Sequence, residues 1–272
     1  MQCPTLGGKQ MVNIYFLGTC SGTEPKPDAY HSSFVIECDG DIFWFDAGEG
    51  CSRRAFLDVG LDIMKTKAIF VSHPHIDHIG GLANLLFLFD KLERVHGKRF
   101  EGDNSLELYF PDMNLLPAIV SVAKSGRVYD FAYGLNTKSV KEGVLYDNGR
   151  VKITALSNTH LGADEADRSR SFSYLFEAEG KNIVFSGDLK RPSEIDTLLV
   201  GGIDVLIMET GHHKVLSVLE YAKEHGVKTL VYNHHGREML TGREEFAKIF
   251  ASDEVRSEIN ALIGFDCMKL SV

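Results

Sequence analysis

The residues best suited to chemistry lie close together in one short stretch of the chain. It contains His73, His75, Asp77 and His78. The apolar run 68–72 precedes them and the apolar stretch 79–89 follows, which predicts a buried strand, a loop and a buried helix. In an extended chain, residues two apart point the same way, so His73 and His75 can face one metal ion. Asp77 and His78, at the turn into the helix, can reach a second ion. These nitrogen and oxygen donors suit zinc, iron or manganese. The alternative is a polar loop that is merely rich in histidine, and unpaired imidazoles beside buried elements disfavour it.

Further histidines and carboxylates follow apolar strands later in the chain. They are His160, Asp188, Glu209, His212, His213, His234 and His235. Strand ends on one edge of packed sheets form a common rim, so these residues can converge with the histidine-rich loop. Asp188 is the candidate bridge, because each of its two oxygens can bind one ion. Taken alone, His160 could equally be a core histidine, and Asp188 could be a turn residue.

Four other residues have no ligand role assigned. We expect His31, His96 and His225 in surface or structural roles, with the role of His31 left open. Asp46 follows an apolar strand and precedes a glycine-rich turn. It either hydrogen-bonds the metal loop from behind or serves as an ordinary turn or cap residue, and the sequence favours neither.

Composition limits the class of protein. The chain has 272 residues, 44% of them hydrophobic and 25% charged, with a formal net charge of −9. This is ordinary for a globular protein with a substantial core, and the acidic balance argues against an extended nucleic-acid surface. The five cysteines are widely spaced without a Cys-x-x-Cys pair, which argues against a disulfide framework or a thiolate zinc site. We expect a cytoplasmic protein without membrane segments.

The order of predicted elements indicates the fold. Strands pair first in hairpins and then alternate with helices, and this happens in both halves of the chain. The predicted hairpins are 33–46 and 172–186, strands are predicted at Val128–Tyr133 and Gly149–Leu156 with a polar connector between them, and a helix Arg243–Phe250 and a strand Met268–Val272 close the chain. No linker rich in proline or serine divides the halves, and residues 1–10 are expected to be a loosely held terminus. We therefore expect one α/β domain over residues 1–272, with two sheets sandwiched between helices.

The histidine motif resembles that of a known superfamily. His73-x-His75-x-Asp77-His78, followed in order by His160, Asp188 and His234, is similar to the metallo-β-lactamase fold superfamily, whose fold is a four-layer αββα sandwich. Within it, the chain is most similar to the ribonuclease Z branch and the related phosphodiesterase of the carbon–phosphorus lyase pathway. The stretches that carry this likeness are 16–22, 32–33, 45–50 and 264–268.

The resemblance implies a role for each candidate residue. His73, His75 and His160 would bind one divalent ion, Asp77, His78 and His234 the other, and Asp188 would bridge them; zinc is the first choice, with manganese or iron as alternatives. His212 would be the histidine implicated in proton transfer, supported by Glu209. His212 lies 22 residues before His234 (234 − 212 = 22), and His213 and His235 share that spacing. The pair His213 and His235 therefore stays open, with His212 and His234 preferred.

The expected activity is hydrolysis. A hydroxide bridging two ions is a nucleophile at neutral pH, and surplus positive charge suits the transition state of a phosphodiester. His212 would protonate the leaving alkoxide. We expect a phosphodiesterase for a small or cyclic substrate.

The alternatives are a thioester, lactone or amide hydrolase and a ribonuclease Z-like RNA endonuclease. Only 28 residues separate His160 from Asp188 (188 − 160 = 28), too few for the arm with which ribonuclease Z grips transfer RNA. A homodimer is left open.

Overall fold

Two seven-stranded sheets, each with an antiparallel and a parallel part, make up the centre of the molecule. The computed structural model describes residues 11–24, 26–125, 127 and 129–272. The first sheet has the order β14 (Lys269–Ser271), β1 (Val12–Gly18), β2 (Ser33–Cys38), β3 (Asp41–Phe45), β4 (Thr66–Phe70), β5 (Ser105–Phe110) and β6 (Gly134–Ser139). The second has the order β13 (Asn260–Ile263), β12 (Thr229–Asn233), β11 (Val205–Glu209), β10 (Lys181–Phe185), β9 (Phe172–Ala178), β8 (Val151–Ser157) and β7 (Gly143–Asp147).

The two sheets repeat one topology. In the first, β1 to β3 pair antiparallel and β3 to β6 pair parallel. In the second, β7 to β10 pair antiparallel and β10 to β13 pair parallel. Parallel neighbours bring their carboxyl ends to one edge of a sheet. The loops after these strands therefore carry the residues that can meet in one site.

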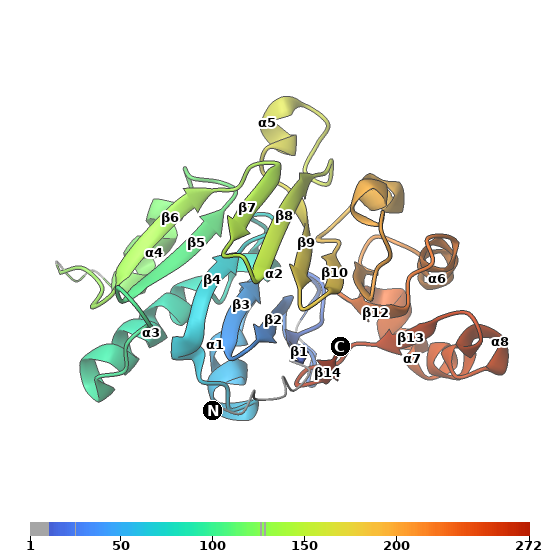
Figure 1. Ribbon diagram of the computed structural model, residues 1–272, viewed down its shortest axis with the longest axis horizontal. Helices are drawn as coiled ribbons and strands as arrows, with labels where there is room; N and C mark the ends of the chain where they lie inside the picture. The colour runs from blue at the N-terminus through green and yellow to red at the C-terminus, as the bar shows by residue number, and fades with distance from the viewer. Residues whose placement is uncertain (1–10, 25, 126, 128) are drawn as a thin grey trace, which may run out of the picture.

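Helices cover the outer face of each sheet, as Figure 1 shows. On the first sheet lie α1 (Cys51–Arg53), a π-helical turn (Arg54–Asp58), a 3₁₀ turn (Ile63–Lys65), α2 (Ile76–Ile79), α3 (Leu82–His96) and α4 (Leu116–Lys124). On the second lie η3 (Pro192–Leu198), α6 (Val215–Glu224), α7 (Arg237–Phe250) and α8 (Asp253–Arg256). The short α5 (Glu165–Arg168) projects beyond the ends of β8 and β9 (Figure 1). The predicted four-layer αββα sandwich is confirmed.

Three apolar layers hold these elements together. The layer between the sheets is rich in aromatic side chains, and Phe34 stacks on Phe45 with their ring centroids 5.1 Å apart. The other two layers lie between each sheet and its helices. In α3 the buried residues recur at helical spacing, as Leu82, Leu85, Phe89 and Leu92, so one stripe of the helix faces the sheet. Because both faces of β3 and β11 are covered, all residues of these strands are buried.

Several sequence-based boundaries were wrong at the exposed edges of the sheets. The predicted strand Val128–Tyr133 is absent: residues 129–133 form no strand, and Val128 lies outside the described residues. Tyr133 instead donates its hydroxyl to the Leu86 carbonyl and packs against α3. The strands β6 and β7 lie in the predicted polar connector, because these edge strands contain no fully buried residue and β6 exposes most of its side chains.

The remaining differences concern the end of the chain. The closing helix begins at Arg237, six residues before the predicted start, and β13 was not predicted.

The predicted loose terminus, residues 1–10, lies outside the described residues. Among the described residues, no helix is long and apolar enough to cross a membrane.

Candidate metal centre

The loop after β4 places its donors at the edge of the first sheet. His73 is buried, and its Nε2 atom lies 3.0 Å from Nδ1 of His75. The short helix α2 then turns Asp77 and His78 inward, where both are buried. The alternation expected for an extended segment thus brings His73 and His75 together, and the helical turn places the ring of His78 beside that of His73, with their centroids 4.0 Å apart.

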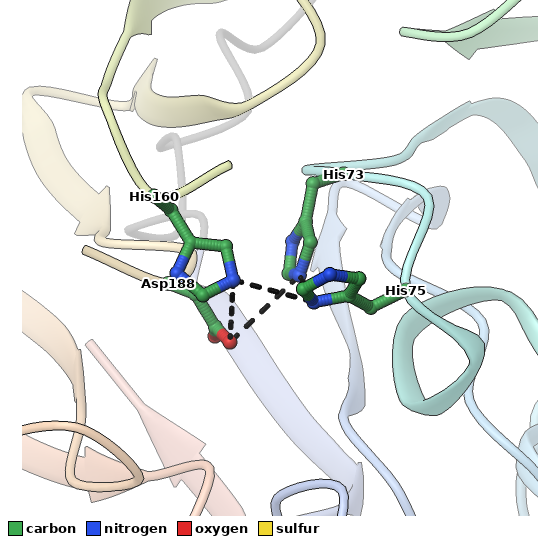
Figure 2. Close-up of side chains that lie close together, drawn as sticks. All are labelled: His73, His75, His160 and Asp188. Carbon is green, nitrogen blue, oxygen red and sulfur yellow. Dashed lines mark hydrogen bonds and ion pairs between the residues drawn. The ribbon is translucent and has the colours of Figure 1, made fainter. Parts of the chain in front are cut away.

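Donors from the second sheet complete a first cluster. Nε2 of His160, which follows β8, lies 3.3 Å from Nδ1 of His75 and 3.7 Å from Oδ2 of Asp188. Nε2 of His73 lies 3.8 Å from the same Asp188 oxygen. Figure 2 shows the three rings and the carboxylate turned toward one another. All four ligand atoms lie within 4.8 Å of one another.

A second cluster also contacts Asp188. It consists of Asp77, His78 and His234. Nε2 of His234 lies 3.1 Å from Oδ2 of Asp77 and 3.4 Å from Oδ2 of Asp188. Nε2 of His78 lies 3.5 Å from both Oδ2 of Asp77 and Oδ1 of Asp188. Asp188 therefore contacts both clusters, as its position after β10 allows.

The backbone of the Asp188 loop is fixed by glycine. Gly187 has φ = 57°, in the left-handed region, and a Cβ atom added there would lie 2.6 Å from the Phe172 carbonyl oxygen. Only glycine fits this close approach without displacing β9. The turn directs Asp188 into the space between the two clusters.

The donors fit divalent metal ions. Ring nitrogens of three imidazoles face one another at 3.0–3.3 Å in the first cluster, an arrangement that a shared cation satisfies. Nε2 of His78 and Oδ1 of Asp188 are buried, and neither has a hydrogen-bond partner among the described residues. Buried polar atoms without partners are costly. Imidazole and carboxylate donors are also the set that zinc, manganese and iron accept.

The pKa values differ between the two clusters. Burial, together with the neighbouring imidazoles, lowers the pKa of His73, and burial lowers that of His160 to about 4. These rings are therefore neutral, which is the form that binds metal. Burial also acts to lower the pKa of His234, but the charge of Asp188 and the contact with Asp77 outweigh it and raise the pKa to about 9. A metal cation would supply the positive charge that these carboxylates attract.

A polar cavity of about 580 Å³ opens beside both clusters. Every one of its lining residues is polar or glycine: Ser21, Gly22, Thr23, His75, Asp77, Asp188, Thr210, Gly211, His212, His213, Lys214, His234, Gly236, Arg237 and Glu238. The N-terminal ends of α6 and α7 contribute Lys214, Arg237 and Glu238. The space next to the donors therefore suits a polar molecule.

His212 stands between this cavity and a buried carboxylate. Its Nδ1 lies 3.1 Å from Oε1 of Glu209, and its backbone N–H donates to Oε2 of Glu209 at 2.9 Å. The hydrogen bond with Glu209 raises the pKa of His212. The side chain of His212 is 44% exposed whereas that of Glu209 is 1% exposed. One ring nitrogen is thus held by Glu209 while the other is free to meet a molecule in the cavity.

Of the histidines next to His212 and next to one another in sequence, His213 and His235 point away from the donor clusters, whereas His234 points toward them. Nε2 of His235 lies 2.8 Å from the Gly264 carbonyl oxygen, and burial lowers the pKa of His235 to about 4. Nε2 of His213 lies 3.3 Å from Oε1 of Glu209, and His213 belongs to neither donor cluster. His234, with φ = 48°, is in the left-handed region, and this backbone turns its ring toward Asp77. The geometry brings His212 and His234 to the site and leaves His235 outside.

Comparison with known proteins agrees with this geometry. A family model described as "Anti-Pycsar protein Apyc1" matches residues 12–213, which is most of the chain. The chain belongs to this family.

Curated relatives place the Apyc1-family chain in a wider group. A ribonuclease Z from Methanothermobacter thermautotrophicus is 24% identical over 279 residues, which cover 82% of this chain and 86% of the relative. A crystal structure of the metallo-β-lactamase fold protein YhfI from Bacillus subtilis matches with a TM-score of 0.71 and 18% identity, over 96% of this chain and 100% of that one. A diphosphatase from the PhnP family matches with a TM-score of 0.66 and 18% identity, over 95% and 97%. The predicted superfamily and branch are confirmed, and the protein is a metal-dependent hydrolase.

The structure of this Apyc1-family chain also settles the position of Asp46. Oδ2 of this buried residue lies 2.7 Å from Nδ1 of His78 and accepts the Ser72 hydroxyl at 2.9 Å. Of the two alternatives for Asp46, the hydrogen bond to the histidine-rich loop after β4 is the one observed. Ser72 was not singled out in the sequence, although its place directly before His73 was the available signal; its Oγ lies 3.0 Å from Nδ1 of His73. His31 has a structural role, because its backbone forms an isolated β-bridge with Cys20, as does the backbone of His235.

Proposed function

We propose that the protein is a phosphodiesterase for a small or cyclic phosphodiester, with one hydrolase domain over residues 1–272 and two divalent metal ions, zinc first among the candidates. The proposed ligands are His73, His75 and His160 for one ion, Asp77, His78 and His234 for the other, and Asp188 for both. Two such ions, when bound, activate water and offset negative charge on the reacting phosphate. The fit of the buried donors described above supports this assignment.

The observation that carries the proposal is the pairing of His212 with Glu209 at the cavity. An alkoxide leaving group needs a proton as its bond breaks, and a histidine is an effective proton donor when its pKa lies near the working pH. Glu209 holds Nδ1 of His212 and stabilises the protonated ring. The opposite nitrogen can then deliver a proton to a leaving oxygen in the cavity. A carboxyl ester with a good leaving group needs such an acid less.

The lining of the cavity supports the substrate class. An acyl chain or an apolar lactone would bind more tightly against apolar side chains, and the lining residues of the cavity include no apolar side chain. A phosphodiester with hydroxyl-bearing substituents matches hydroxyl, amide N–H and charged groups better. This disfavours the thioester, lactone or amide hydrolase that the sequence left open.

A second candidate is an RNA endonuclease, which the ribonuclease Z relatives favour. The segment between β8 and β9 carries only the four-residue helix α5. This leaves a small surface for a folded RNA at the position where ribonuclease Z commonly carries its arm. The net charge of −9 also works against phosphate binding over an extended surface. A small substrate is therefore the first choice.

The test compares two leaving groups in His212→Ala. We expect this variant to keep its metal and to lose roughly 10²–10⁴-fold in rate on an alkyl phosphodiester. On a nitrophenyl phosphodiester, whose leaving anion needs no proton, the loss should be far smaller. His213→Ala, which removes the other ring beside Glu209, is the matched control and should affect both rates little.

Two outcomes would count against the proposal. Equal losses on both substrates in His212→Ala would remove His212 as the acid. Activity of the wild-type protein on thioesters or lactones, but not on cyclic or linear phosphodiesters, would remove the substrate class. A parallel assay with precursor transfer RNA separates the second candidate from the first.

A further inference from the structure

Glu194 joins two segments of the site that are not neighbours in the sheet. It lies in η3, six residues after Asp188. Its Oε1 accepts the backbone N–H of Thr159 at 3.1 Å and also the Thr159 hydroxyl. Its Oε2 accepts the backbone N–H groups of Lys190 at 2.9 Å and Arg191 at 3.2 Å. One carboxylate thus binds four donors, two on each side.

These two groups of donors stand next to proposed metal ligands. Thr159 directly precedes His160, and Lys190 follows Asp188 by two residues. The strands that lead to them, β8 and β10, are separated by β9. Apart from the contact between His160 and Asp188 themselves, no other hydrogen bond among the described residues joins 157–161 to 188–191.

The other bonds of the His160 segment lead to β9 and the residue before it. The side-chain oxygen of Asn158 accepts the His160 backbone N–H at 3.1 Å and the Ser171 hydroxyl at 2.6 Å. Asn158 therefore ties this segment to the start of β9. Without Glu194, the His160 segment and the Asp188 loop would be linked only indirectly, through β9, which pairs with both β8 and β10.

We propose that Glu194 is a positioning residue that holds His160 at the distance from Asp188 required to share a metal ion. The inference rests on the proposed ligand set. Hydrogen bonds to a carboxylate are stronger than those between neutral groups, and four of them restrain both segments. Outer partners of this kind typically change metal affinity by 10–100-fold when they are removed.

The position of Glu194 predicts a selective effect. Its contacts reach the segment of His160, a ligand of the first cluster only, and the segment after Asp188, where the bond from the Leu189 N–H to Oε1 of Glu209 gives a second restraint. Asp77, His78 and His234 have no bond with Glu194 or its partners among the described residues. Loss of the carboxylate should therefore weaken one of two ions and spare the other, which a general loss of stability would not do.

The experiment measures zinc binding to the whole chain, without an activity assay. Zinc stoichiometry and the two dissociation constants are determined by competition with a chromophoric chelator for wild type, Glu194→Ala, Glu194→Gln and Glu142→Ala. Glu142 is the matched control. It accepts the Ser157 hydroxyl at 2.6 Å at the end of the same strand, β8, without contact with the Asp188 loop. The unfolding midpoint of each metal-free variant reports the fold.

We expect Glu194→Ala to bind one ion as wild type does and the other at least about 10-fold more weakly. Glu194→Gln keeps one acceptor oxygen and should fall in between, while Glu142→Ala should match wild type. Two ions bound with unchanged affinity by Glu194→Ala, or both weakened equally, would overturn the inference. If Glu194→Ala does not fold, Thr159→Val, which removes only the hydroxyl bond, replaces it and should weaken the same ion less. Wild type that binds fewer than two ions would refute the proposed two-metal site instead, which keeps the two failures apart.

Discussion

Oδ2 of Asp46 lies 2.7 Å from Nδ1 of His78, and both side chains are fully buried. The other oxygen of Asp46 accepts the Ser72 backbone N–H at 2.7 Å. A carboxylate at Nδ1 keeps the proton of a neutral imidazole on that side, so Nε2 of His78 is available as a donor atom toward Asp77 and Asp188. The end of β3 therefore determines how the loop after β4 can bind a metal.

Asp46→Asn tests this relationship. The amide has nearly the same size but no charge, so His78 loses the partner that holds its tautomer and its basicity. We expect metal affinity to fall about 10–100-fold, measured by competition with a chelator. Asp62→Asn, at an exposed position before the 3₁₀ turn, is the control and should bind metal as wild type does. Unchanged affinity in Asp46→Asn would show that the pairing is only structural.

Asp188→Ala and His160→Ala should differ in metal content. Asp188 contacts both donor clusters, whereas His160 belongs to one. We expect the Asp188 variant to lose both ions and the His160 variant to retain one, because loss of the bridge also leaves two cations without the charge between them. Elemental analysis of the two purified variants, after the same dialysis, gives the answer. Loss of a single ion in both would argue that Asp188 serves only one site.

Glu209→Gln should resemble a mild form of His212→Ala. The amide can still accept a hydrogen bond at His212 but does not stabilise the protonated ring. We expect a rate loss on an alkyl phosphodiester of about 10-fold or more and little loss on a nitrophenyl one. The ratio of the two rates is the measured quantity, with metal content checked. A Gln variant with an unchanged ratio would separate Glu209 from proton transfer.

Asp90→Asn should destabilise the packing of α3 against the segment before β6. Asp90 is 1% exposed and accepts the Ala132 backbone N–H at 2.8 Å, as well as bonds from Arg94 and Arg127. We expect a loss of about 1–3 kcal/mol in the free energy of unfolding at pH 7. Urea unfolding measures it, with Asp62→Asn as the exposed control.

The effect at Asp90 should depend on pH. Burial acts to raise the pKa of Asp90, but its hydrogen bonds with Ala132 and the arginines outweigh burial and lower the pKa. The carboxylate therefore contributes stability above the pKa of an unfolded aspartate, about 4, and loses it as pH falls through the folded value. The difference between wild type and Asp90→Asn should shrink below about pH 4. A gap that widens in acid would contradict the assigned direction.

The sequence predicted the paired strands because burial leaves a clear pattern. Strands such as β3 and β11 are covered on both faces and read as continuous apolar runs. The donors after β4, β8, β10 and β12 were predicted together, because strand ends that run in one direction meet at one edge. The edge strands β6 and β7 left no such pattern, since neither contains a fully buried residue.

Choices between adjacent residues needed the structure. His234 and His235 both follow β12, and only the left-handed backbone of His234 decides which ring enters the site. Asp46 could be a turn residue or a partner of the metal loop, and the distance to His78 decides it. Glu194 gave no signal, because its four donors come mainly from backbone groups, which sequence does not reveal.

The donor clusters lie across the seam between the two sheets. His73, His75, Asp77 and His78 come from the first sheet, whereas His160, Asp188 and His234 come from the second. An ion held by both groups would therefore act as a cross-link between parts of the chain that are more than eighty residues apart, closing long loops as a disulfide does. Removal of the metal would then also remove this cross-link at the rim, and the apolar layer between the sheets would be left to hold the two halves together.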